Sequence, residues 1–143
     1  MSKSSAIFVL ALKLFYFDYP QDSTARIWRL FLNTHSPIKL ELENFAIEVL
    51  EKSKEVPVLV DFTAEWCAPC QVMIPILNQL AASSKGKFII GKVDTDEQQK
   101  LAGQYNVRGF PTFKLFRHGK VVEETTGVQS ERILREMINH YCI

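Results

Sequence analysis

The chain contains few cysteines, glycines and prolines, has almost no net charge and has no long apolar run. Its three cysteines include only one close pair, which argues against the disulfide framework of a small secreted protein and favours a reducing compartment. Seventeen basic and sixteen acidic residues give a net charge of +1, so nothing predicts nucleic-acid binding. The 143 residues, 47% of them hydrophobic, without internal repeats, predict one packed core.

Residues 1–36 differ in composition from the rest of the chain. The apolar stretch 6–12 is interrupted by Lys13 and is shorter than the roughly 20 residues that a transmembrane helix needs, so we expect no stable membrane insertion. A secretory signal is disfavoured, because aromatic residues stand at 15–17, where a small-residue cleavage site should begin. Five serines, two threonines and only two acidic residues leave open a targeting segment, an added helix or a misassigned start. We expect the domain at 37–143 and a cytoplasmic location, or the plastid stroma if the first segment is a transit sequence.

From residue 37 onward, short apolar segments alternate with segments of helical periodicity, which predicts an α/β fold. Strands are expected at 58–62, 87–93, 112–116 and 121–126. Helices are expected at 43–54, 68–84 and 97–105, and in a last segment that follows Ser130.

Single residues add local expectations. Pro75 lacks a backbone N–H and should kink the helix at 68–84. His118-Gly119 predicts a hairpin turn, and Asp96 and Ser130 are expected to cap the helices that follow them. The last helix should present five residues to the sheet: Ile133, Leu134, Met137, Ile138 and Tyr141.

The run Trp66-Cys67-Ala68-Pro69-Cys70 lies where the strand at 58–62 is expected to turn into a helix. Two cysteines at this spacing lie about one helical turn apart, so they can form a disulfide or separate as thiols and thereby carry two electrons. Cys67, at the helix start, faces unpaired N–H groups and the positive end of the helix dipole, which lowers the pKa of its thiol. We therefore expect Cys67 to be the attacking sulfur and Cys70 to resolve the mixed disulfide.

This run resembles the motif of the thioredoxin family, which usually has glycine where this chain has Ala68. The resemblance covers residues 38–143 and implies the thioredoxin fold, a central mixed sheet with helices on both faces. It also implies a monomeric protein-disulfide reductase that needs no metal or organic cofactor beyond its redox-active disulfide, with disulfide-containing proteins and a thioredoxin reductase as partners. Residues 70–78 are similar to the y-type thioredoxins of cyanobacteria and plastids, which implies peroxiredoxin-like targets and a ferredoxin-linked or nicotinamide-linked reductase.

The resemblance also implies roles for residues outside the motif. Asp61, a carboxylate within an apolar strand, would assist the deprotonation of Cys70, and its burial would raise its pKa. Lys92 would lie beside Asp61, and Pro111 would follow a cis peptide bond next to the dithiol. We expect substrates to bind to the backbone before this proline and to an apolar patch around Cys67: Trp66, Ala68, Pro69, Phe110, Pro111, Gly127 and Val128. From the residues alone, Asp61 could instead be satisfied by backbone or water, and Lys92 could be a solvated edge residue.

Other functions stay open at this point. The cysteine pair could be half of a zinc site, whose further ligands would have to come from Cys142, His35, His118 and His140. An exported protein of this fold could be a disulfide oxidase or isomerase, although the Ala-Pro dipeptide argues against strong oxidising power. The domain could also serve as a binding or scaffold module. Cys142 is expected to be exposed at a mobile chain end, without a role beyond occasional intermolecular oxidation.

Overall fold

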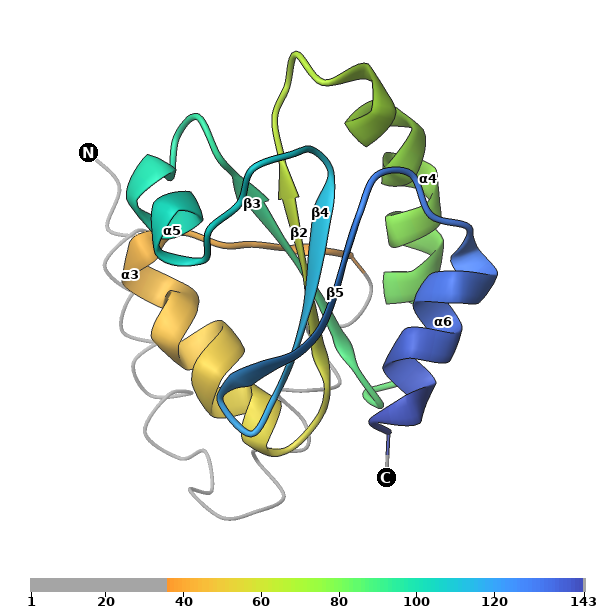
Figure 1. The fold of residues 1–143 in the computed structure, drawn as a ribbon. Helices are drawn as coiled ribbons and strands as arrows, with labels where there is room; N and C mark the ends of the chain where they lie inside the picture. Colours follow the sequence, from red (N-terminus) through yellow and green to blue (C-terminus); the bar gives the residue numbers. More distant parts are fainter. Residues whose placement is uncertain (1–35, 143) are drawn as a thin grey trace, which may run out of the picture. The chain divides into compact units, whose positions relative to one another are not determined.

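The computed structural model describes residues 36–142, which form one sheet flanked by helices (Figure 1). Apart from Ser36, the segment 1–36 lies outside the described residues, so its interpretations as targeting sequence, added helix or misassigned start stay predictions. No helix within the described range is both long enough and apolar enough to span a bilayer.

Five strands form a mixed sheet in the order β1-β3-β2-β4-β5. They are β1 (Ile38–Lys39), β2 (Val58–Thr63), β3 (Ile89–Asp94), β4 (Thr112–Arg117) and β5 (Lys120–Thr126). β3 is parallel to β1 and β2, whereas β4 is antiparallel to β2 and β5. All residues of β2 are buried, as in a central strand that is covered on both faces. The short edge strand β1 was not predicted from the sequence.

Helices cover both faces of this sheet, which confirms the expected fold class (Figure 1). On one face lie α4 (Ala68–Ala82) and α6 (Glu131–His140). On the other lie α5 (Gln99–Gln104) and a helical segment that begins as α3 (Leu42–Phe45) and continues as a π-helix (Ala46–Glu51) and a 3₁₀ turn (Lys52–Lys54). The segment expected as one helix at 43–54 is therefore helical throughout but changes its hydrogen-bond spacing twice.

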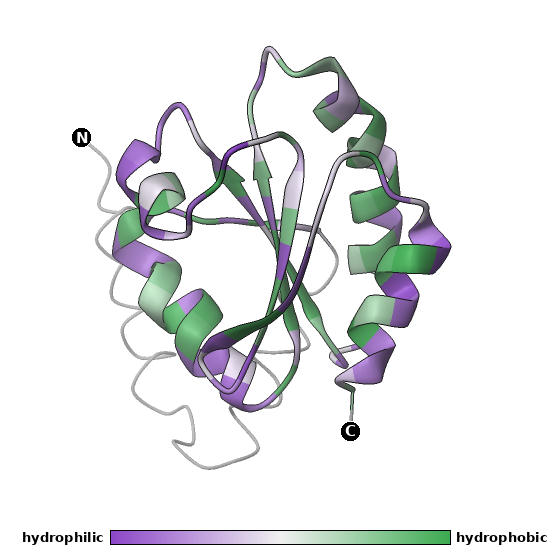
Figure 2. Ribbon diagram, viewed as in Figure 1, coloured by the Kyte–Doolittle hydropathy of each residue, from purple (hydrophilic) through white to green (hydrophobic). Residues whose placement is uncertain are grey.

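Apolar side chains fill the space between the sheet and each helix layer. Under α4 and α6, Leu59, Phe113 and Leu115 pack with Met73 and Leu134 in one buried cluster. On the opposite face, aromatic rings are in mutual contact, with centroids 5.2 to 6.1 Å apart: Phe45, Phe62, Tyr105 and Phe116. Figure 2 shows the corresponding concentration of hydrophobic residues along the central strands.

The structure confirms two local predictions, the cap of the last helix and the hairpin turn. The side chain of Ser130 accepts a hydrogen bond from the backbone N–H of Ile133 at 3.3 Å, so the predicted cap of α6 is confirmed. The predicted hairpin turn is also confirmed, because positive φ angles of 54° at His118 and 76° at Gly119 turn β4 into β5.

One expectation for α6 is wrong. Ile133 does not face the sheet and is 41% exposed. Leu134 and Ile138 are fully buried, and Ile133 is displaced by about 100° around the helix from Leu134. The kink expected at Pro75, inside α4, stays a prediction.

Candidate active site

The two cysteines of the motif lie at the first turn of α4, directly after the loop that leaves β2. Cys67 is the N-cap residue, with extended backbone angles of φ −84° and ψ 107°, and Pro69 occupies the first turn. The Sγ atom of Cys67 accepts the backbone N–H of Cys70 at 3.2 Å. The two residues form a disulfide, with their Cα atoms 5.3 Å apart. The outer sulfur therefore occupies the position where a side-chain oxygen caps an ordinary helix.

The disulfide is recessed and almost fully buried. Cys67 is 4% exposed and Cys70 is 1% exposed, and both pack with Ala64 and Phe110 in a small apolar cluster. The first turn of α4 contains no acidic residue, so no side-chain charge there opposes the positive end of the helix dipole. The attacking role expected for Cys67 stays a prediction.

Asp61 is a buried carboxylate on the sheet face that α4 covers. Side chains alternate along a strand, so Asp61 shares its face with Leu59, which packs against α4. Asp61 is 2% exposed, and its Oδ1 atom has no hydrogen-bond partner among the described residues. Desolvation raises the pKa of Asp61 to about 7, although the charge of Lys92 opposes this shift.

Lys92 is the direct neighbour of Asp61 across the parallel pairing of β3 and β2. The structure thus brings the two residues together as expected. The side chain of Lys92 is exposed, and within the described part of the chain no ion pair links it to Asp61. Its influence on Asp61 is therefore electrostatic and acts through space.

The loop before β4 reaches the dithiol from the other side. The peptide bond between Phe110 and Pro111 is cis, as the resemblance implied. The hydroxyl of Thr112 donates to the carbonyl of Gly109 at 2.6 Å, and the N–H of Gly127 donates to the carbonyl of Pro111 at 2.8 Å. These bonds hold the corner at 127–128 beside the proline.

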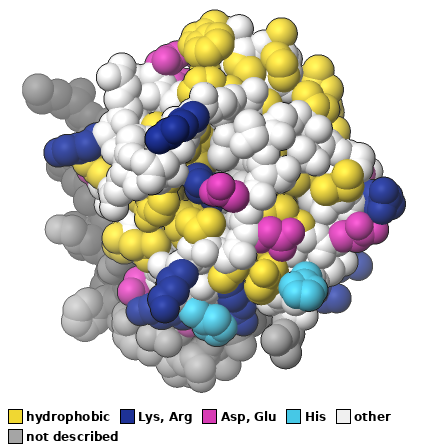
Figure 3. Space-filling view, viewed as in Figure 1, with side chains coloured by type: hydrophobic (Ala, Val, Ile, Leu, Met, Phe, Trp, Pro, Cys, Tyr) yellow, Lys and Arg dark blue, Asp and Glu magenta, His cyan; other side chains and the backbone are white. Residues whose placement is uncertain are grey.

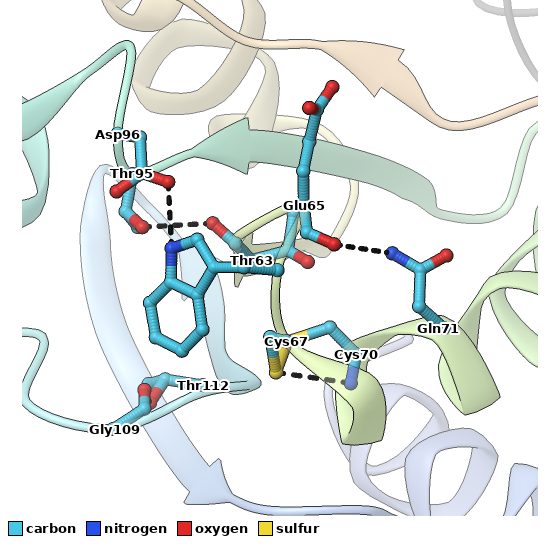
Figure 4. The surroundings of a disulfide bond; sticks show 10 residues. Thr63, Glu65, Cys67, Cys70, Gln71, Thr95, Asp96, Gly109 and Thr112 are labelled. Atoms are coloured by element: carbon cyan, nitrogen blue, oxygen red, sulfur yellow. Dashed lines mark hydrogen bonds between the residues drawn. A yellow bond between two sulfur atoms is a disulfide. The ribbon is translucent and has the colours of Figure 1, made fainter.

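Trp66 is 68% exposed, yet two contacts fix its indole. Its Nε1–H donates to Oδ2 of Asp96 at 2.9 Å (Figure 4). Its ring meets that of Phe110 edge to face, with centroids 5.6 Å apart. Gln71, one turn into α4, donates to the carbonyl of Glu65 at 3.2 Å and ties the loop to the helix (Figure 4).

The role expected for Asp96 is wrong. α5 begins at Gln99 with Gln98 as its N-cap, and Asp96 binds Trp66 instead. The N–H and the hydroxyl of Thr95 both donate to the carbonyl of Thr63 at 2.9 Å (Figure 4). These two bonds hold the next residue, Asp96, beside the indole of Trp66. Sequence reasoning missed Asp96, Thr95 and Gln71 as site residues, because their partners lie in other segments or are backbone atoms.

The expected substrate-binding residues surround the dithiol. Trp66, Ala68, Pro69 and Val128 are exposed, and Phe110 and Gly127 are half-buried. Pro111 is buried, so its side chain is not part of the exposed surface. Figure 3 shows apolar side chains gathered at the upper end of the molecule, over the loop after β2 and the start of α4. A largely apolar surface, with the carboxylates of Glu65 and Asp96 nearby, therefore borders the recessed sulfur.

Cys142 departs from its expected environment. It is half-buried against the cluster under α6, and its Sγ lies 3.7 Å from the carbonyl oxygen of Lys87. Burial raises the pKa of the Cys142 thiol, which makes it less reactive than an exposed cysteine near neutral pH. Across residues 36–142, no three His, Cys, Asp or Glu side chains form a group that could hold a metal ion.

Comparisons with known proteins identify the family. The thioredoxin family model matches residues 36–140. The thioredoxin of Chlorobaculum thiosulfatiphilum is 39% identical over 99 residues, which are 69% of this chain and 90% of that protein. The chloroplastic M-type thioredoxin of Spinacia oleracea is 40% identical over 87 residues, which are 61% of this chain and 48% of that protein.

A solved structure agrees with these relatives. The N21Q mutant thioredoxin from Halobacterium salinarum NRC-1 superposes with a TM-score of 0.69 at 37% identity and covers 78% of this chain and 95% of its own. The disulfide at a helix start, the cis proline in the loop before β4 and the buried aspartate on β2 stand in the segment that matches the family. The chain therefore belongs to the thioredoxin family and is a protein-disulfide reductase that exchanges disulfides through Cys67 and Cys70.

Proposed function

We propose that Cys67 is the sulfur that attacks the substrate disulfide and that Cys70 completes the exchange. The thiolate of Cys67 forms a mixed disulfide with one substrate sulfur, and the other substrate sulfur leaves as a thiolate. Cys70, once deprotonated, then attacks Cys67 and releases the second substrate sulfur. Two electrons pass to the substrate, and the Cys67–Cys70 disulfide is the oxidised product. The observation that carries this order is the N-cap position of Cys67, whose Sγ accepts the N–H of Cys70.

Asp61 is the base in this scheme. With a pKa of about 7, its carboxylate can take a proton from Cys70 near neutral pH and release it again. An ordinary carboxylate, with a pKa of about 4, would be a far weaker proton acceptor. The free Oδ1 atom and the location under α4 support the assignment. Lys92, on the neighbouring strand, keeps the pKa of Asp61 from rising further.

Substrate proteins bind around the recessed sulfur in this proposal. The backbone of Phe110 pairs with an extended segment of the substrate, as the resemblance to the family implies. Trp66, Ala68, Pro69, Gly127 and Val128 supply apolar contacts. Support comes from their exposure and from the packing of Phe110 against Cys67 and Cys70.

A partner reductase must restore the dithiol after each turnover, as in the family generally. We infer that this reductase is ferredoxin-linked or nicotinamide-linked and that peroxiredoxin-like proteins are among the targets, a view that rests on the y-type resemblance at 70–78.

We place the protein in the cytoplasm, or in the plastid stroma if residues 1–36 are a transit segment. Intact mass of the native protein decides whether that segment is retained, and reduction assays with each type of reductase decide the electron source.

Trapping of the mixed disulfide tests the assignment of the two sulfurs. Cys70→Ser, reduced and mixed with a disulfide-bonded protein, should accumulate a covalent adduct, because no second thiol releases it. Cys67→Ser should form no comparable adduct, since the remaining Cys70 is fully buried. The opposite pattern, with the adduct at Cys70, would exchange the two roles.

A further inference from the structure

The outer face of α4 lacks charge, although it is exposed to solvent. None of the residues from Ala68 to Ala82 is acidic or basic. In α6, the other helix on this face of the sheet, Glu131, Arg132, Arg135 and Glu136 are all charged. A surface helix of a globular protein ordinarily carries charged residues on its solvent side. α4 is therefore an exception within its own domain.

This face also exposes a large apolar side chain. Val72 is 55% exposed, whereas Cys70, Met73 and Leu77 form the buried face. Ile74, two positions further along, is exposed at the opposite edge of that buried face and is not part of the surface around Val72. Figure 3 shows apolar side chains over the loop after β2 and over the start of α4. The uncharged face is thus continuous with the surface around Cys67, where a protein substrate must bind for the exchange to occur. Continuous exposed apolar surface of this kind marks interaction sites.

Helix geometry gives the reach of a partner bound at Cys67. At 1.5 Å per residue, Val72 lies about 7.5 Å along the axis from Cys67, and Ala82 lies about 22 Å away. A stable protein interface covers about 800 Å² on each partner, which corresponds to a disc of roughly 16 Å radius. A folded protein joined to Cys67 therefore covers Val72 and leaves Ala82 free. A small disulfide reaches neither residue.

We propose that the first half of the outer face of α4, centred on Val72, is a docking surface for folded proteins that bear a disulfide in an apolar, uncharged surrounding. The dithiol exchange at Cys67 supplies the covalent step, and α4 supplies selection among substrates. Gln71, bonded to the carbonyl of Glu65, supplies an uncharged polar group at the edge of this surface. A charge placed at Val72 would be buried without a partner against such a substrate, which costs binding free energy.

Charged substitutions along the helix provide the test. Val72→Lys and Val72→Glu are compared with Ala82→Lys, which stands on the same exposed side beyond the expected contact. Lysine and glutamate are better helix formers than valine, so α4 should stay folded, and thermal unfolding checks this. The full-length protein is reduced beforehand. Single-turnover rates are then measured with native insulin and with a small uncharged disulfide, bis(2-hydroxyethyl) disulfide, whose rate a charge at position 72 should not change through electrostatics.

The measured quantity is the ratio of the insulin rate to the small-disulfide rate. Both substitutions at Val72 should lower this ratio by about tenfold, the effect of one central interface residue, and Ala82→Lys should leave it unchanged. An unchanged ratio in both Val72 variants would overturn the proposal, and so would an equal loss in Ala82→Lys. Opposite effects of lysine and glutamate would indicate a charged partner and would also overturn it. If the unsubstituted protein reduced neither disulfide, the dithiol function itself would fail, which is a different result from a changed ratio.

Discussion

The carboxylate of Asp96 holds the indole of Trp66 through a hydrogen bond of 2.9 Å between Oδ2 and Nε1. The loop that carries Asp96 is itself fixed, because Thr95 donates twice to the carbonyl of Thr63 at the end of β2. An exposed aromatic side chain beside the dithiol is therefore held by the same strand end from which the catalytic loop starts.

Loss of this hydrogen bond should loosen the indole and weaken substrate binding. In Asp96→Ala we expect a severalfold lower kcat/KM for a protein disulfide, because a hydrogen bond to a charged but exposed group contributes about 1 kcal/mol. Fluorescence anisotropy of Trp66 should fall as well, measured in a Trp28→Phe background where Trp66 is the only indole. Asp96→Asn keeps an acceptor oxygen and should restore most of both signals. If the alanine variant kept full anisotropy, Asp96 would not be what fixes the ring.

The buried carboxylate should make stability depend on pH. The pKa of Asp61 is about 7 in the folded protein and about 4 in the unfolded chain, so between these values the folded state binds a proton that the unfolded state does not. The contribution of Asp61 to stability is therefore largest below about pH 4 and is lost as the pH rises to about 7, in total on the order of 4 kcal/mol. Urea unfolding of the oxidised protein at about pH 5 and about pH 8 measures the difference.

Asp61→Asn is the matched variant for this effect. It removes the titrating group at nearly constant shape, so the slope of stability against pH should flatten, and the variant should exceed the unsubstituted protein in stability above about pH 7. Glu123→Gln, an exposed carboxylate on β5, serves as the control and should leave the slope unchanged. A slope in Asp61→Asn equal to that of the unsubstituted protein would show that other groups cause it.

The same substitution should slow the chemistry. Without the carboxylate of Asp61, deprotonation of Cys70 depends on water, and we expect reduction of a protein disulfide to slow by about tenfold or more near neutral pH. The slowed step should be the release of the reduced substrate from the mixed disulfide, measured in a single turnover. The rate of the first attack by Cys67 should change little. Identical pH profiles for the variant and the unsubstituted protein would refute the role of Asp61.

The cap of α6 offers a test of stability alone. Ser130→Ala removes the acceptor for the N–H of Ile133 and should cost about 1 kcal/mol of unfolding free energy in urea. Ser130→Asp keeps an acceptor and should restore that stability. Ser130 lies two residues beyond Val128 and is not one of the residues expected to contact the dithiol. The rate at which the small disulfide is reduced should therefore be the same in Ser130→Ala and Ser130→Asp. A loss in Ser130→Asp as large as in Ser130→Ala would mean that the cap bond does not stabilise the helix.

What the sequence predicted well was local. Cys67 at a helix start, Ser130 at another and the turn at His118-Gly119 each depend on neighbours within a few positions, and each is found as expected. The thioredoxin resemblance supplied what local reasoning could not, such as the cis bond before Pro111 and the adjacency of Asp61 and Lys92.

The features that the sequence did not predict depend on contacts between distant segments. Asp96 reads as a helix cap because it precedes helical residues, yet its partner Trp66 lies 30 positions away. Lys114 belongs to an apolar strand and is buried beside Glu124, its neighbour on β5, on the opposite face of the sheet from Asp61. No pattern along the chain indicates either pairing, because the strand register that creates it forms only in the folded sheet.

The recessed position of the disulfide limits the enzyme that regenerates it. With Cys67 only 4% exposed, the sulfur of an incoming donor must descend below the rim formed by neighbouring side chains. The same limit applies to substrates and to the electron donor. Each should accordingly present its reactive sulfur on a segment that projects from its own surface, and a donor lacking such a segment should fail even where its redox potential is favourable.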